Sequence, residues 1–185
     1  MKSRKVYEAL GDIFKGKDVN DLKQHMNLSG LNDVFQDVMV ALIEKGYLPQ
    51  PIPEASEDYR KNVYSYMGKK IVSGDAAWIK LKAKEELDDM DFFFHDSFND
   101  EVSSTDSMVH IMELEDGAYS INVSVNFRGT WKTRTDDEED LPYFDDRIDV
   151  NSADKVVAAT MKQVNKAEIF LQSEIDRLKK YAEQW

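Results

Sequence analysis

The stretch "AYSINVSVNFRGTW", from Ala118 to Trp131, alternates apolar and polar side chains with a period of two. Such alternation predicts a long β-strand with one buried face and one solvent-facing face. The face predicted to be buried carries Tyr119, Ile121, Val123, Val125, Phe127 and Trp131. The face predicted to meet solvent carries Ser120, Asn122, Ser124, Asn126, Arg128 and Thr130. This is the strongest secondary-structure signal in the chain, and it predicts that the fold contains a β-sheet.

The neighbours of this strand predict an antiparallel sheet. "SMVHIMELE", from Ser107 to Glu115, predicts a second strand, and Asp116 and Gly117 supply the Asp-Gly pair of a tight hairpin turn. Two weaker strand candidates, "MDFFFHDSF" at residues 90–98 and "YFDDRIDV" at residues 143–150, would extend the sheet.

The last segment of the chain predicts a long helix. It opens with Asn151 or Ser152 as a cap and has Asp154 in its first turn, where a negative charge suits the helix dipole. About thirty residues at 1.5 Å each give a length of about 45–50 Å, enough to cross a sheet or to project toward a partner. A four-three spacing, interrupted at Glu168, places on one face Val157, Met161, Val164, Leu171, Ile175, Leu178 and Trp185.

The first half of the chain predicts helices. Residues 1–48 predict a three-helix module whose third helix is capped by Ser29 and stops at Gly46. A helical period returns over residues 55–90, with a break at Ser73–Asp75. We therefore expect an α+β fold: a helical N-terminal portion, an antiparallel sheet of three to four strands, and a long C-terminal helix packed on the sheet.

The predicted domain organisation follows from this layout. The module at 1–48 is followed by a proline-rich linker at 49–54 and by an α+β domain at 55–185. That domain contains an acidic segment at 91–150 and the C-terminal helix at 152–184.

Composition narrows the classes of function. The chain has no cysteine, which excludes disulfides, thiolate metal sites and thiol nucleophiles. No stretch is apolar enough for a signal peptide or a membrane span, so we expect a cytoplasmic protein, in a cell or in an infected host.

The negative charge is concentrated in one segment. Of a net charge of −12, residues 91–150 supply all, because they hold sixteen Asp and Glu against four Lys and Arg, whereas the flanking parts are nearly neutral. Such asymmetry is typical of an interaction surface, and it disfavours direct binding to nucleic acid or to an anionic membrane.

The densest part of this segment is "TRTDDEEDLPYFDDRIDV", residues 133–150, with eight carboxylates. It has no glycine for the sharp turn of a calcium loop. Its aromatics would give a partner apolar contact besides charge. A solvated loop, or protection of a sheet edge, is the alternative. The candidate partner-binding residues are Asp136, Asp137, Glu138, Glu139, Asp140, Tyr143, Phe144, Asp145 and Asp146.

No catalytic, metal or cofactor motif is present, so we predict none of these sites. We expect a non-enzymatic protein that binds a basic protein partner, as an acidic inhibitor or regulator covering a basic surface, including one that binds nucleic acid. One alternative is a metal-dependent enzyme that uses carboxylates and His95, which has Asp91, Asp96 and Asp100 nearby in sequence. Another is a structural subunit that self-assembles through its C-terminal helix. The sequence leaves the target and the oligomeric state open.

Overall fold

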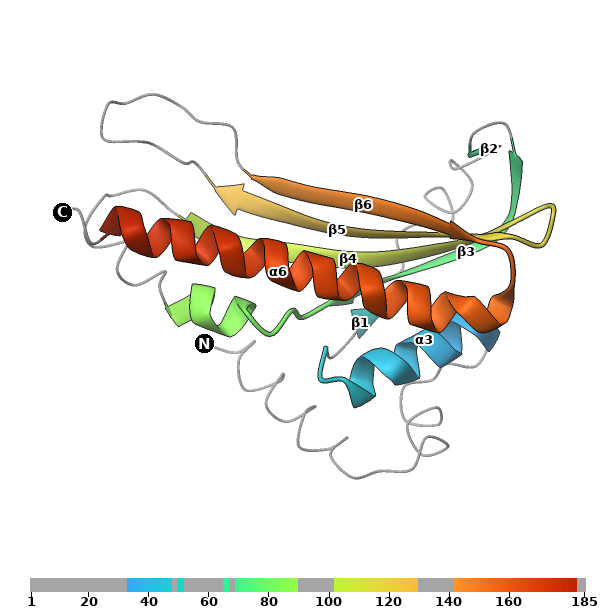
Figure 1. The fold of residues 1–185 in the computed structure, drawn as a ribbon, viewed down its shortest axis with the longest axis horizontal. Helices are drawn as coiled ribbons and strands as arrows, with labels where there is room; N and C mark the ends of the chain where they lie inside the picture. The colour runs from blue at the N-terminus through green and yellow to red at the C-terminus, as the bar shows by residue number, and fades with distance from the viewer. Residues whose placement is uncertain are drawn as a thin grey trace.

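The computed structural model describes residues 33–47, 50–51, 65–66, 69–89, 102–129 and 142–182. These residues form an antiparallel sheet with helices packed on one face (Figure 1). The α+β class predicted from the sequence is thereby confirmed. In chain order the elements are α3 (Asp33–Glu44), β1 (Gln50–Pro51), β2 (Ser65–Tyr66), β3 (Lys69–Ile79), a short helix (84–89), β4 (Val102–Leu114), β5 (Tyr119–Gly129), β6 (Tyr143–Val150), η1 (Ala153–Lys155) and α6 (Val156–Ala182).

The sheet has the strand order β1-β3-β4-β5-β6, with β2 paired to β3 off this path. Every pairing is antiparallel. Four strands, β3 to β6, are long, whereas β1 and β2 have two residues each. Within the described part of the chain β6 is therefore an edge strand.

Strand β5 behaves as its alternation predicts. Its apolar face, from Tyr119 to Phe127, is buried and belongs to one hydrophobic core. The register sets Val109 of β4 opposite Val123, and Ile111 opposite Ile121, on that same face. The hairpin is also confirmed: Gly117 has φ 77°, and its N–H donates to the Leu114 carbonyl at 2.9 Å. A positive φ suits glycine because it has no Cβ to clash.

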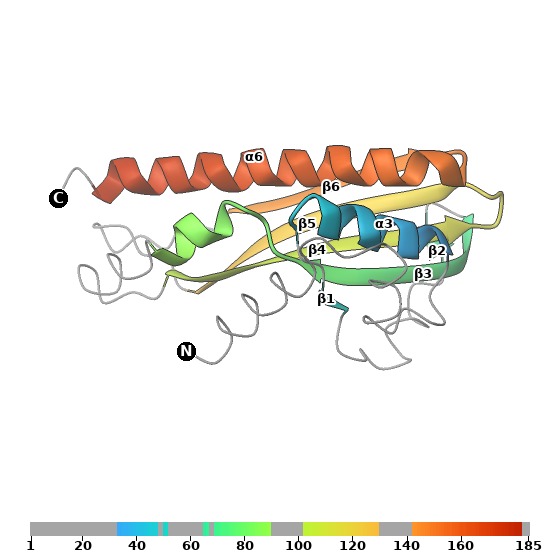
Figure 2. The same cartoon turned by 90° about the horizontal axis from the view of Figure 1, so that it is seen from below.

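Helix α6 lies along the face of the sheet that carries the buried side chains of β5, and it packs on β5 and β6 (Figure 2). Of its predicted apolar face, Val164, Leu171, Ile175 and Leu178 are buried, and Val157 and Met161 are partly buried. Trp185, also predicted on this face, lies outside the described residues. Full burial of a leucine side chain stabilises the fold by about 1.5–3 kcal/mol. Ser152 occupies the N-cap of η1, but its side chain makes no capping hydrogen bond. Most of the stability of α6 comes from the tertiary packing of its apolar face.

Glu168, which interrupts the apolar stripe of α6, bonds to a distant part of the backbone. Its carboxylate accepts the N–H of Lys82 at 2.9 Å and the N–H of Ala83 at 2.6 Å. These N–H groups precede the short helix 84–89, where intrahelical acceptors are lacking. A second link joins the same helix to α6: Glu86 accepts hydrogen bonds from Lys179 and from Gln172. The carboxylates of Glu168 and Glu86 thus link the short helix 84–89 to α6.

The predicted helical period over residues 55–90 was wrong at 69–79, which form strand β3. This segment pairs with β4 over most of its length, and non-local pairing overrides a local pattern. The break noted at Ser73–Asp75 lies next to a register irregularity between Ile71 and Ser73. A helix does form at 84–89, where Leu87 is buried.

The N-terminal helix α3 ends where predicted. Gly46 has φ 84°, its N–H donates to the Ile43 carbonyl at 2.9 Å, and the Tyr47 N–H donates to the Leu42 carbonyl at 2.8 Å. This pair of bonds is a Schellman motif. The apolar residues Phe35 and Met39 of α3 belong to the same core cluster as the buried residues of β5 and α6. The first two predicted helices lie outside the described residues, and the division into 1–48, 49–54 and 55–185 stays a prediction.

Candidate functional site

The described part of the predicted acidic site is the edge strand β6. Its residues alternate between the two faces of the sheet. Phe144, Ile148 and Val150 pack against the core on the α6 side. The register places the remaining face beside the polar face of β5, because it pairs Tyr143 with Asn126, Asp145 with Ser124, Arg147 with Asn122 and Asp149 with Ser120. We call this second side the outer face.

Three side chains of β6 project from the outer face. Tyr143 is 74% exposed, and Asp145 and Asp149 are also exposed. The Asn122 amide donates a hydrogen bond to the Asp145 carboxylate, which fixes that side chain on the sheet surface. An aromatic ring and two carboxylates are thus presented together at the edge of the sheet.

Arg147 lies between these acids and turns back over the sheet. Its Nε donates to Ser120 Oγ at 2.8 Å, and its Nη2 lies 3.6 Å from Met112 Sδ. Because the guanidinium lies over them, Ser120 and Met112 are almost fully buried. The neighbouring His110 has its pKa lowered, first by burial and then by the positive charge of Arg147.

The prediction that the polar face of β5 meets solvent was therefore wrong at two positions. Ser120 and Ser124 are buried, whereas Asn126 is exposed. Arg147 covers Ser120, and the alternation of a single strand gives no information about side chains that reach across from the next strand. Arg128 and Thr130 lie outside the described side chains.

Two of the predicted partner-binding residues face α6 instead. The Phe144 ring lies 5.5 Å from the Phe170 ring. Asp146 accepts a hydrogen bond from Lys166 Nζ at 2.5 Å and one from the Arg147 N–H at 2.8 Å. The Lys166 ammonium, as the main cause, lowers the pKa of Asp146. Both side chains hold the edge strand against the long helix.

The other predicted site residues lie outside the described residues. These are Asp136, Asp137, Glu138, Glu139 and Asp140, so their role in partner binding stays a prediction. The same holds for the rival site at His95, with Asp91, Asp96 and Asp100. No group of three or more His, Asp or Glu side chains in the described ranges is placed to hold a metal ion.

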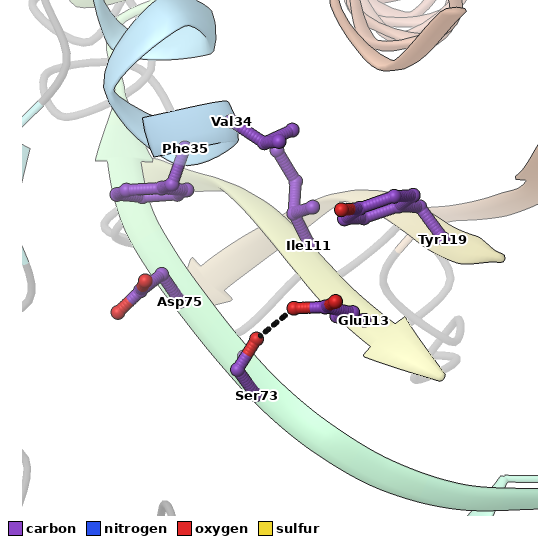
Figure 3. Close-up of a pocket in the computed structure, with 8 residues that line it drawn as sticks. Val34, Phe35, Ser73, Asp75, Ile111, Glu113 and Tyr119 are labelled. Atoms are coloured by element: carbon purple, nitrogen blue, oxygen red, sulfur yellow. Dashed lines mark hydrogen bonds between the residues drawn. The ribbon is translucent and has the colours of Figure 1, made fainter. Parts of the chain in front are cut away.

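A small pocket lies between the start of α3 and the strands β3, β4 and β5 (Figure 3). Ser73 Oγ donates to the Glu113 carboxylate at 2.9 Å. The pKa of Tyr119 is raised by burial and, to a lesser degree, by the negative charge of Glu113. The sequence analysis did not find this pocket, because Ser73 and Asp75 lie at a predicted break between helical segments, whereas in the structure they belong to strand β3.

Comparison with known proteins identifies no relative. No family model, no curated protein and no solved structure matches this chain. Among the described helices, none combines the length and the apolar character needed to cross a membrane.

Proposed function

We propose that this protein is a non-enzymatic binding protein that docks on a basic surface of a target protein. It acts as an acidic inhibitor or regulator by covering that surface, and a surface that binds nucleic acid is the clearest case. A cytoplasmic setting, in a cell or in an infected host, suits a chain without cysteine.

The observation that supports the proposal is the arrangement of β6. Its exposed side chains Tyr143, Asp145 and Asp149 lie along one face of this edge strand, with Tyr143 next to Asp145 and Asp149 toward the other end. In sequence only Leu141 and Pro142 separate the strand from the five acids from Asp136 to Asp140. A partner would meet carboxylates and an aromatic ring in one place, and aromatic residues are enriched in the cores of protein interfaces.

The charge distribution favours a role in association rate. Sixteen acidic residues lie in the segment 91–150, so the electrostatic attraction to a basic partner acts over a distance of about a Debye length, 8–10 Å. Such steering raises the association rate constant and makes it fall with salt. Tyr143 would then mainly slow dissociation, because apolar contact forms only after docking.

Affinity capture from lysate of the source organism or of its host, at low and at high salt, tests the proposal. Three variants are compared with the natural chain. One replaces Asp136–Asp140 with the corresponding amides, one is Asp145→Asn/Asp149→Asn, and the matched control is Asp89→Asn/Asp154→Asn, two exposed acids outside the segment 91–150.

We expect a basic protein to be retained at low salt by the natural chain and by the control, and to be released at high salt. With that purified protein, the five-amide variant should associate about tenfold more slowly, with a flatter salt dependence. Equal retention by all four chains would remove the acidic segment from the interface and overturn the proposal.

A further inference from the structure

We propose that β6 accepts an added β-strand: an extended segment of the partner, with basic residues alternating with apolar ones, pairs with the outer edge of β6. This inference rests on the proposed function and names the way in which the basic partner binds. Pairing with β6 would give the partner a defined backbone register in addition to the attraction between opposite charges.

The edge of β6 has the geometry that strand addition needs. Within the described ranges β6 pairs only with β5, and Figure 1 shows no described strand beyond it. The strand has eight residues, from Tyr143 to Val150. In an edge strand, alternate N–H and C=O groups point away from the sheet, and an extended peptide can satisfy them.

The outer side of β6 fits a basic strand. Asp145 and Asp149 are exposed and four residues apart, which is about 13 Å along a strand. Lysines four residues apart in an added strand would each lie beside one carboxylate, because cross-strand neighbours share a face. Arg147, midway between the acids, favours a small neutral residue opposite it. Since the acids flank Arg147 symmetrically, the same pattern fits a parallel or an antiparallel partner.

The α6 side of β6 fits apolar residues. Of the four β6 side chains on this side, Phe144, Ile148 and Val150 are apolar and only partly buried, although they pack against the core, and Asp146 is paired with Lys166. An added strand would place its alternate side chains next to them and would remove more of their surface from water. A purely electrostatic contact would leave that surface exposed. The preferred partner segment therefore alternates basic residues on one side with apolar residues on the other.

Charge argues for a different protein as the occupant, in place of a second copy of this chain. Two copies, each with a net charge of −12, would have to meet at their acidic edges. Like charges brought together across a sheet are destabilising, and this charge excess opposes self-pairing.

A synthetic peptide tests the inference directly. The probe is Thr-Val-Lys-Val-Ser-Val-Lys-Val-Thr-amide with an uncharged fluorophore on its N-terminus, and binding to the full chain is measured by fluorescence anisotropy at low salt. A second peptide has the same sequence with alternate backbone amides N-methylated, in two versions that block either edge of the peptide. It keeps the charge and the side chains but loses hydrogen-bond donors.

Two protein variants separate charge from structure. Asp145→Asn/Asp149→Asn removes both charges, and it retains the side-chain oxygen that Asn122 contacts. Asp89→Asn/Asp154→Asn removes the same number of charges from exposed positions elsewhere. Amide hydrogen exchange along β6 shows whether its backbone groups become protected.

Strand addition predicts that the plain peptide binds and slows exchange in β6. It also predicts that at least one N-methylated version binds about tenfold more weakly or worse, and that only the β6 variant loses affinity. If all versions of the peptide bind equally, strand addition is overturned, whereas docking by charge stands. If no peptide binds, strand addition is also overturned, and the capture experiment decides the proposed function independently. A dimer with protected β6 amides in the absence of peptide would overturn it too, because the edge would then be occupied by a second copy.

Discussion

Replacing Glu168 with alanine should destabilise the protein by removing the acceptor of the Lys82 and Ala83 N–H groups, which lie 86 and 85 residues away in sequence. The carboxylate accepts two backbone N–H groups, from Lys82 at 2.9 Å and from Ala83 at 2.6 Å. In Glu168→Ala both donors lose their acceptor. The Lys82 N–H is at an exposed site, where water replaces the carboxylate at little cost, whereas the Ala83 N–H is partly buried.

The free energy of unfolding should fall by about 2 kcal/mol. An unsatisfied buried donor costs about 1–3 kcal/mol, and hydrogen bonds to charged groups are stronger than those between neutral groups. For a chain of this size that corresponds to a decrease in Tm of about 4–8 °C. Urea unfolding followed by far-UV circular dichroism measures it. The matched control is Glu174→Ala on the same helix, which removes a partly exposed ion pair with Arg177 and should cost at most about 0.5 kcal/mol.

A second measurement locates the effect. Glu168 is the lesser of two causes that raise the pKa of Tyr47, after burial, so the pKa of Tyr47 should fall in Glu168→Ala but stay above its ordinary value. Amide exchange should accelerate in residues 82–88 before it does in β5. If Glu168→Ala and Glu174→Ala are equally stable, the Glu168 carboxylate does not stabilise the short helix 84–89, and this prediction is refuted.

Three further predictions concern the core and the sheet. Leu171→Ala should lose about 2–5 kcal/mol of unfolding free energy because Leu171 is fully buried. The control Ile169→Ala on the same helix changes a side chain that is 62% exposed and should lose less than about 1 kcal/mol. Equal losses for the two variants in urea unfolding would contradict the packing of α6. Thr105→Val should stabilise the protein by about 1 kcal/mol, since the Thr105 hydroxyl is buried and has no hydrogen-bond partner in the described structure; a lower Tm would show that this hydroxyl is satisfied in solution. The pKa of His110 is lowered in the folded chain, so the unfolded chain binds the proton more tightly, and the free energy of unfolding should fall as pH decreases below about 6.5. In His110→Gln this part of the pH dependence should disappear; the same dependence of stability on pH in both proteins between pH 7.5 and 5.5 would refute the prediction.

Part of the proposed site was accessible from the sequence. The acidic run and its aromatics marked β6 as a candidate surface, and Asp145 and Tyr143 are indeed exposed. The sequence did not distinguish Tyr143 from Phe144, which packs on Phe170, or Asp145 from Asp146, which pairs with Lys166. Those differences depend on which face of β6 meets α6, and the sequence alone does not show where that helix lies.

The features that the sequence determined by itself are local ones. The alternation of β5 predicts its buried face, and Gly117 and Gly46 predict a turn and a helix end, because each depends on the conformation of a few neighbouring residues. The apolar stripe of α6 likewise follows from helical geometry.

Other features depend on partners that are distant in the chain, and they became visible only in the folded structure. Residues 69–79 become a strand because β4 supplies the hydrogen bonds, although their own spacing suggested a helix. Glu168 interrupts the stripe because it accepts the N–H groups of Lys82 and Ala83, and Ser120 is buried because Arg147 reaches across from the next strand. In each case the free energy comes from groups far apart in the chain, and a local pattern does not contain their positions.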